Sequence, residues 1–320
     1  MGDNPTFRNI INGNFSKKEG IRSFILLSHD SLFKKVVEAL LSSKMFATTK
    51  GIVQNFLDIV KEKGFVPNGA RIYYLNRSQP PLLIQMFYAY FMATNDTSFL
   101  SSSIDLLEQE YLFWMKFKLV NYVTNNKTYT LNHYNVVSSI PRPESYREDF
   151  LKANESANAT RYYSNVMTAA ESGWDFSSRW FVDPMDIGTI SITDMIPVDL
   201  NAIMYRNEFI LSELYRVLNN QSKSQEYEKA MKMREEAINE ILWDEKLNTW
   251  ADLNMLTNKL HTDYLYITDL APLWFNIVPK VDAQIILARY ESLLMSHVSG
   301  KKFLNRNVLY KEIKEFYFFK

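Results

Sequence analysis

The residues best suited to acid–base chemistry lie in the stretch Glu171–Trp180. Asp175 stands there between two large aromatic residues, Trp174 and Phe176. Aromatic rings around a carboxylic acid exclude water, and this desolvation keeps a general acid protonated near neutral pH. Trp174 and Trp180 are also candidate surfaces for the apolar face of a sugar ring. The alternative is an acid that caps a helix while its aromatic neighbours fill a core, and the stretch taken alone favours this alternative.

Three polar clusters elsewhere in the chain offer planar donors and acceptors in loops next to predicted helix starts. They are Asn68–Gly69, Arg77–Gln79 and Arg142–Glu144. Guanidinium, amide and carboxylate groups match a ligand that is dense in hydroxyl groups. Helix capping and loop hydrogen bonds are the alternative, and they are the better interpretation of any one cluster alone, since most side-chain hydrogen bonds go to backbone or water.

Composition excludes several other chemistries. The chain has no cysteine, so thiolate metal sites and cysteine nucleophiles are excluded, and its four histidines lie far apart, without the spacing of a zinc site. Its 9 glycines form no phosphate-binding loop. Asp96 and Asp105 lack the ligand pattern of a calcium loop. We therefore predict no metal and no cofactor. The formal net charge of zero gives no reason to expect nucleic acid as a partner.

Hydrophobic periodicity predicts a mostly helical chain. Helices are expected at about 30–41, 48–63, 80–92, 98–120, 159–170, 197–218, 223–242, 267–277 and 281–297. Lys127–Thr130 and Tyr134–Val137 predict a short β-hairpin, and residues 249–257 predict a short strand. Helices that follow one another through short connections favour an all-α toroid or bundle. We treat residues 1–320 as part of one domain, with residues 1–18 irregular.

The cellular compartment stays open. Seven sequons for N-glycosylation favour the secretory route only weakly, because an asparagine-rich chain produces them by chance. The N-terminal residues carry no apolar signal-peptide core, and no apolar run is long enough to span a bilayer, so membrane association is not evident.

Four blocks of the sequence resemble the α,α-trehalases, glycoside hydrolase family 37. The first is Pro67–Pro81, which reads PNGARIYYLNRSQPP, and the second is Glu171–Trp180. Pro197–Ala202 and Tyr264–Trp274 follow in the same order as in the family. The resemblance covers about residues 19–300. It implies an (α/α)6 barrel, incomplete in this chain and with a small β-hairpin insertion, that hydrolyses trehalose to two glucoses with inversion. The resemblance extends to animal-type relatives, which are secreted or anchored to a membrane.

The resemblance also implies roles for individual residues. Asp175 matches the family's general acid, and Gly173 matches a substrate contact. The positions that match sugar-binding residues are Asn68, Arg77, Ser78, Gln79, Arg142, Pro143 and Glu144. These are the residues of the three polar clusters, so the two lines of reasoning agree.

The first family signature, roughly Pro-Gly-Gly-Arg-Phe-x-Glu-x-Tyr-x-Trp-Asp, is altered in Glu19–Asp30. Arg22 and Asp30 are kept and remain candidate contacts to sugar hydroxyls. Ile25 stands in place of the glutamate and His29 in place of the tryptophan. Losing one charged or stacked contact costs about 1–3 kcal/mol, so we expect weaker sugar binding.

The second family signature, Gln-Trp-Asp followed by proline and aromatic residues, has no counterpart here. We therefore expect the general-base glutamate beyond it to be missing as well. An inverting glycosidase needs a second carboxylate about 6.5–9.5 Å from its acid. Activity of this chain is then in doubt, and two alternatives stay open: a non-catalytic sugar-binding paralogue, or an incomplete gene product.

Overall fold

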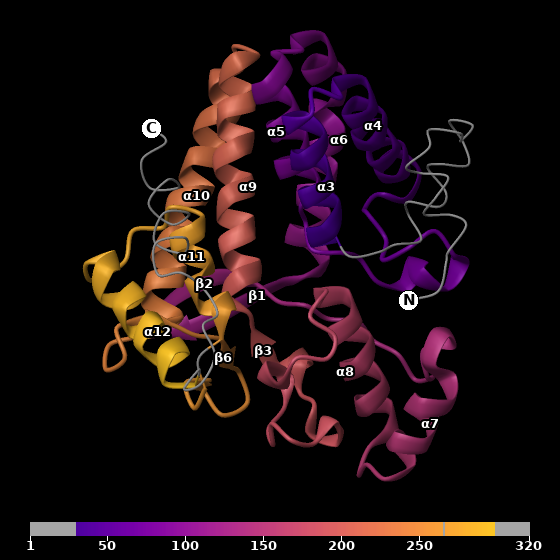
Figure 1. Cartoon of the computed structure of the whole chain (residues 1–320), viewed down its shortest axis with the longest axis vertical. Coiled ribbons are helices and arrows are strands. Elements are labelled where there is room, and N and C mark those ends of the chain that lie inside the picture. Colours follow the sequence, from indigo (N-terminus) through magenta and orange to yellow (C-terminus); the bar gives the residue numbers. More distant parts are fainter. Residues whose placement is uncertain (1–29, 265, 298–320) are drawn as a thin grey trace. The chain divides into compact units, whose positions relative to one another are not determined.

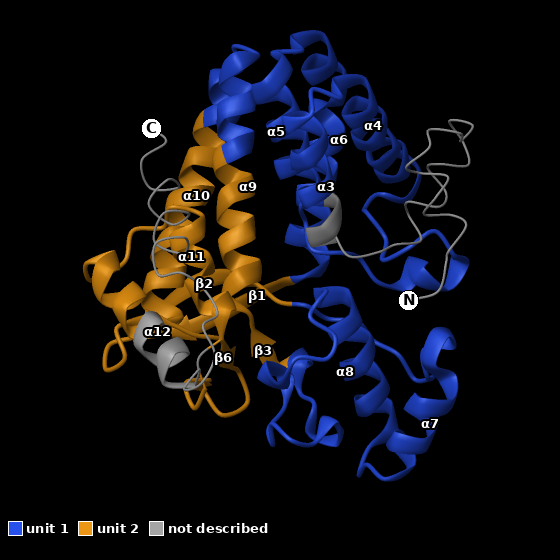
Figure 2. Cartoon of the chain, viewed as in Figure 1, with its two compact units in different colours: residues 1–118, 134–193, 210–224 blue, residues 119–133, 194–209, 225–320 orange. Residues whose placement is uncertain are grey.

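The computed structural model describes residues 30–264 and 266–297, and the chain divides into two compact units (Figures 1 and 2). Unit 1 comprises the described residues of 1–118, 134–193 and 210–224. Unit 2 comprises those of 119–133, 194–209 and 225–320. The irregular segment predicted at 1–18 lies outside the described residues, and the single domain expected from the sequence stays a prediction.

Unit 1 is built from antiparallel helix pairs (Figure 1). Its complete helices are α3 (Asp30–Ser42), α4 (Phe46–Lys63), α5 (Leu83–Thr94), α6 (Thr97–Phe117), α7 (Tyr146–Asn154) and α8 (Ala159–Ser172). Helix α4 packs against α3, α5 and α6, and α7 packs against α8. Helix α4, expected at about 48–63, buries its apolar face, with Val53, Leu57 and Val60 fully enclosed.

Local signals set the ends of these helices. Gly64 ends α4 in the left-handed conformation at φ 86°, where its amide donates to Val60 O at 2.7 Å. The side chain of Asp96 begins α6 by accepting from the amide of Phe99 at 3.0 Å, and Asn158 begins α8 in the same way. Because such caps satisfy backbone groups that the helix leaves unpaired, they fix where the connecting loops start.

In its described residues, unit 2 combines helices with three very small sheets. Its strands are β1 (Leu119–Thr124), β2 (Lys127–Asn132), β3 (Met195–Ile196), β4 (Trp243–Asp244), β5 (Thr249–Trp250), β6 (Leu253–Asn254) and β7 (Lys259–Leu260). Its helices are α11 (Ala271–Trp274) and α12 (Ala283–His297), with parts of α9 (Val198–Val217) and α10 (Gln221–Ile241), which contribute to both units.

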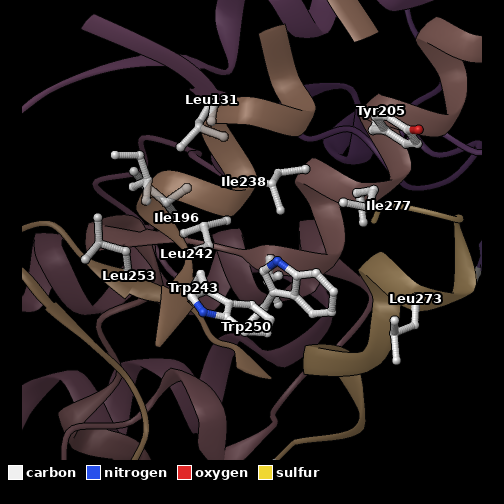
Figure 3. Packing of buried hydrophobic residues seen from close by; sticks show 14 of the residues in the cluster. Leu131, Ile196, Tyr205, Ile238, Leu242, Trp243, Trp250, Leu253, Leu273 and Ile277 are labelled. Carbon is white, nitrogen blue, oxygen red and sulfur yellow. The ribbon is translucent and has the colours of Figure 1, made fainter. Parts of the chain in front are cut away.

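The core of unit 2 gathers around two tryptophans (Figure 3). The rings of Trp243 and Trp250 meet edge to face, with 5.0 Å between their centroids. Apolar side chains at the end of α10, such as Ile238, and just after it, such as Leu242, belong to the same buried cluster. The indole N–H of Trp250 donates to Asn239 Oδ1 at 2.9 Å, so its one polar atom is satisfied.

The β-hairpin predicted from the sequence exists and Lys127–Thr130 is one of its strands, but the partner strand was wrongly placed at 134–137. Strand β2 pairs with β1, with Tyr129 opposite Tyr122, and not with residues 134–137. Asn125 and Asn126 connect the strands at φ 49° and 59°. Asparagine tolerates positive φ at both positions of a two-residue hairpin turn, which fixes the register of the pair. The predicted strand at 249–257 is likewise corrected to the two short strands β5 and β6.

Helix α7 was not predicted. Three of its apolar side chains, Tyr146, Phe150 and Leu151, are exposed, so its sequence carries no strong buried stripe. The two rings stack on the surface with centroids 6.2 Å apart. Helix α7 contributes a buried acid, Asp149, to unit 1, and this acid is part of the candidate site.

Candidate active site

The loop between α4 and α5 brings two of the polar clusters together. Pro67 and Ser78 form an isolated antiparallel bridge. The amide of Asn68 donates to the carbonyl of Arg77 at 3.0 Å, within the same bridge. The short 3-10 helix η1 (Ile72–Asn76) closes the loop between them. Residues that are far along the loop from one another therefore face each other across its base.

The side chains of this loop are buried and bonded to one another. Arg77 Nε donates to Asn68 Oδ1 at 3.0 Å, and Gln79 Nε2 donates to Asn68 O at 3.1 Å. Asn68 Nδ2 in turn donates to Ala170 O, in the last turns of α8, at 3.0 Å. Arg77, Ser78 and Gln79 are each at most 3% exposed. The loop is therefore a fixed part of unit 1 that is attached to α8.

The third polar cluster joins the same network. Glu144 pairs with Arg77 Nη2. Arg142 holds Asp149 of α7 through two parallel bonds, Nε to Oδ2 at 2.8 Å and Nη2 to Oδ1 at 2.7 Å. Its guanidinium also lies over the ring of Phe176, 4.7 Å from the centroid. The third cluster is thus fixed by α7 on one side and reaches the Asp175 segment on the other.

The electrostatics link this cluster to Asp175. Burial opposes the charge of Arg142, but the hydrogen bonds and charge of Asp149 outweigh it and raise the pKa of Arg142. The charges of Glu144 and Asp175 act in the same direction. Arg142 is therefore a fixed cation whose field reaches Asp175.

Glu171, in the last turn of α8, ties three further segments to the site. Its Oε1 accepts from both the amide and the hydroxyl of Ser78, at 2.9 and 2.6 Å. Lys118, just after α6, donates to both of its oxygens at 2.7 and 2.9 Å. The amide of Asn135 donates to Oε2 at 3.1 Å. The Glu171 side chain is fully buried and the Lys118 side chain is 7% exposed, so this ion pair lies inside unit 1.

Gly173 ends α8 and starts the turn that carries Asp175. It adopts the left-handed conformation at φ 73°. The amide of Trp174 then donates to Ser172 Oγ at 3.1 Å, and the carbonyl of Trp174 accepts from the amide of Ser177 at 2.7 Å. The indole N–H of Trp180 donates to the same carbonyl at 3.1 Å. The turn is therefore held by its own hydrogen bonds.

Asp175 itself is exposed, and two expectations about it are wrong. The aromatic enclosure does not form, because the Phe176 ring turns towards Arg142 and Trp174 is 42% exposed. The capping alternative also fails, since Gly173 is the C-cap of α8 and Ser177 is the N-cap of the next 3-10 turn. Within the described part of the chain, no hydrogen bond reaches the carboxylate of Asp175.

The two tryptophans differ from their predicted role as stacking surfaces. Trp180 is 1% exposed, and the guanidinium of Arg179 lies 4.0 Å from its ring centroid. A ring so enclosed cannot receive a sugar, so that part of the prediction is wrong. Trp174 remains available because a large part of its surface is exposed beside Asp175.

Two buried polar atoms of the loop have no hydrogen-bond partner among the described residues. They are Arg77 Nη1, a donor, and Gln79 Oε1, an acceptor. Buried polar groups are nearly always paired, so each such atom calls for an explanation. A hydroxyl group both accepts and donates, and it fits this combination.

The remaining predicted contacts lie near the start of the described chain. Asp30 is the first residue of α3, and Arg22 lies outside the described residues.

Among the residues that the structure covers, no group of three or more acids or histidines is arranged to hold a metal ion. None of the helices described there is long and apolar enough to cross a membrane.

Comparison with known proteins decides the family. The family model for trehalase matches residues 28–304. This chain belongs to the trehalase family. Trehalase of Apis mellifera is 42% identical over 248 residues, which are 75% of this chain and 39% of that protein. Trehalase of Homo sapiens is 42% identical over 244 residues, 75% of this chain and 42% of the relative. The chain thus spans about two fifths of the length of these curated trehalases.

A solved structure supports the fold. The neutral trehalase Nth1 from Saccharomyces cerevisiae superimposes with a TM-score of 0.61 at 19% identity, over 80% of this chain and 51% of that one. The fold class predicted from the sequence, an all-α (α/α)6 barrel protein of the trehalase family, is confirmed by this likeness and by the helical content.

Sequence reasoning missed the residues that support this candidate site. Glu171 lay in a quoted block but received no role, and Lys118, Asn135 and Asp149 were not singled out. A glutamate four residues before the candidate acid, in the last turn of a helix, was the available signal. No such signal marked Lys118, because lysines are mostly exposed and nothing in the neighbouring sequence indicates that this one is buried.

Gly173→Ala tests the turn that carries Asp175. The added Cβ would meet Pro80 Cγ at 3.7 Å, an ordinary contact, so any cost comes from the backbone at φ 73°. A left-handed alanine costs about 1–2 kcal/mol, and we expect that loss in the free energy of unfolding. Gly51→Ala is the control: it lies within α4 with open space around it and should stabilise by about 0.5–1 kcal/mol. Urea titrations measure the free energy of unfolding of both variants. Equal changes in the two would show that the left-handed backbone at Gly173 does not cause the loss.

Proposed function

We propose that this chain acts in the hydrolysis of α,α-trehalose to glucose with inversion, and that Asp175 is the general acid. One observation carries the proposal. Glu144, Asp149 and Glu171 are each engaged by a lysine or arginine, whereas Asp175 accepts no hydrogen bond from any described residue. An exposed carboxyl that accepts no hydrogen bond from the described residues is accessible to a ligand and can pass a proton to it.

The polar loop supplies the contacts that orient the sugar. Arg77 Nη1 and Gln79 Oε1 are unpaired in the described structure, and hydroxyl groups of the sugar would satisfy them. Glu144 keeps one side partly exposed beside Arg77 and can accept from another hydroxyl. Five further residues hold these groups in place or line the same region: Asn68, Ser78, Arg142, Pro143 and Gly173. The exposed Trp174 offers an apolar surface for a ring.

In the proposed reaction, Asp175 donates its proton to the glycosidic oxygen as the bond to the anomeric carbon breaks. A water attacks that carbon from the opposite face, and a base takes up the water's proton. The ring that is attacked leaves as β-glucose, and the other leaves as α-glucose. Inverting enzymes supply the base as a second carboxylate about 6.5–9.5 Å from the acid.

A non-catalytic sugar-binding function is the second candidate. It is favoured by the same ion pairs, because among the described carboxylates of the site only Asp175 is unengaged. A site with one working carboxylate binds a disaccharide without hydrolysing it efficiently.

Calorimetry and product analysis separate the two candidates. Trehalose is titrated into the purified chain, with maltose as a comparison disaccharide, and the products are followed by proton NMR. Binding of trehalose with initial release of α- and β-glucose in equal amounts supports inverting hydrolysis. Binding without glucose supports the second candidate, and absence of binding contradicts both.

Arg77→Lys tests the sugar-binding role of the loop. Lysine keeps the charge but loses the planar fork that reaches Asn68 and Glu144 and leaves Nη1 for the ligand. Loss of a charged hydrogen bond costs about 1.5–3 kcal/mol, so we expect the Kd for trehalose to rise about 10-fold or more. Calorimetry measures it at a temperature where circular dichroism shows a folded chain. An unchanged Kd would remove Arg77 from the site.

A further inference from the structure

The buried carboxylate of Glu171 joins four segments of unit 1 that are distant in sequence. It lies in α8 and contacts the Ser78 loop, Lys118 after α6, and Asn135 after β2. Asp175 follows only four residues later, beyond the Gly173 turn. Glu171 is thus the shared anchor of the loop that would hold the sugar and of the segment that would protonate it.

Only donors surround this carboxylate in the described structure. Oε1 receives the amide and hydroxyl of Ser78, Oε2 receives the amide of Asn135, and Lys118 donates to both oxygens. Two acceptor oxygens are therefore needed at this position. A neutral glutamine of the same shape would present its NH2 group to donors on one side or the other.

We propose that Glu171 is a positioning residue: its carboxylate, neutralised by Lys118, sets the Ser78 loop relative to the segment that carries Asp175. This inference rests on the proposed function, since the loop is assigned to the sugar and Asp175 to the proton. Glu171 has no accessible surface, so it acts through Ser78 and the end of α8 and does not touch the substrate.

Glu171 holds the loop at Ser78, between the two residues assigned to the ligand. Ser78 donates to Glu171 through two groups, and its neighbours Arg77 and Gln79 carry the unpaired atoms assigned to the ligand. A shift of Ser78 therefore moves both contacts at once. Small displacements of binding groups are costly because the ligand needs all of its contacts in register.

The test compares Glu171→Gln with a matched control, Glu208→Gln. Glu208 is 1% exposed and pairs with Arg234 at 2.8 Å, but it lies in unit 2 and has no place in the site. Both variants remove a buried charge from a buried ion pair. Backbone amide exchange and the trehalose Kd are measured on the full chain, below the unfolding transition of each variant.

We expect Glu171→Gln to accelerate exchange of the Ser78 or Asn135 amide about 10-fold and to raise the trehalose Kd about 10-fold, as the loss of a charge-assisted bond implies. Glu208→Gln should leave both readouts as in the wild type, even if its unfolding temperature falls equally. If Glu171 had only a structural role, both variants would change amide exchange and the trehalose Kd in the same way. Unchanged exchange at both amides, with an unchanged Kd, would overturn the proposal.

Two provisions keep the test decisive. If Glu171→Gln does not fold, Ser78→Ala removes only the hydroxyl donor and should still accelerate exchange at its own amide, by less than 10-fold. Wild-type exchange there would then overturn the proposal. If the wild-type chain binds no trehalose, the proposed function fails, while the exchange measurement alone still decides whether Glu171 holds the loop.

Discussion

Replacing Asp175 by asparagine is expected to lower the rate of glucose release from trehalose by about 10²–10⁴-fold, the usual contribution of a general acid. Asparagine has nearly the same shape but no carboxylic proton to donate. Because the Asp175 side chain is exposed and receives no hydrogen bond from the described residues, its replacement should leave the fold intact. Initial rates at saturating trehalose measure the loss, and calorimetry should show a Kd within a few-fold of the wild type.

Asp183→Asn is the matched control for this variant. Asp183 is also an exposed aspartate of unit 1, and among the described residues its carboxylate accepts a local bond from the amide of Met185 at 3.0 Å. Its replacement should leave the rate unchanged. If the two variants release glucose equally fast, Asp175 is not the proton donor.

Lys118→Met is expected to cause a larger loss of stability than Gly173→Ala or Lys116→Met. The substitution leaves the Glu171 carboxylate buried without its cation, and breaking a buried pair in this way costs about 3–5 kcal/mol. The free energy of unfolding from urea titration measures the loss. Adding Glu171→Gln to Lys118→Met removes the unpaired charge, so the double variant should recover part of the stability.

Lys116→Met is the control for this prediction. Lys116 lies two residues away and is exposed, with its ammonium 5.0 Å from the ring of Phe117. An exposed substitution of this kind changes stability by at most about 0.5 kcal/mol. A comparable loss in Lys116→Met and Lys118→Met would show that burial of the Lys118–Glu171 pair is not the cause.

Sequence alone gave most of the helices, because their apolar spacing and caps are local signals. Helix α4 with Gly64 at its end is the clearest case. The hairpin was misplaced because the helical pattern before it was extended to residue 120, over the first residues of β1. The turn residues Asn125 and Asn126 were the overlooked signal. Helix α7 escaped because its exposed aromatic residues hide the periodicity.

The site was predicted as a set of residues but not as an arrangement. The polar clusters meet as expected of a single site: Arg77 pairs with Glu144, and Asn68 bonds Arg77. The environment of Asp175 was not predictable, because it depends on Phe176 turning to Arg142 and on Trp180 being buried. Both are outcomes of packing between distant segments, which local sequence does not encode.

A comparison of two substrates in Asp175→Asn tests whether Asp175 protonates the leaving sugar. Trehalose needs a proton on its departing oxygen, whereas α-glucosyl fluoride releases fluoride with far less need of acid catalysis. The variant should lose about 10²–10⁴-fold in rate on trehalose and less than about 10-fold on the fluoride. Equal losses on both substrates, or no loss on trehalose, would show that Asp175 is not the proton donor.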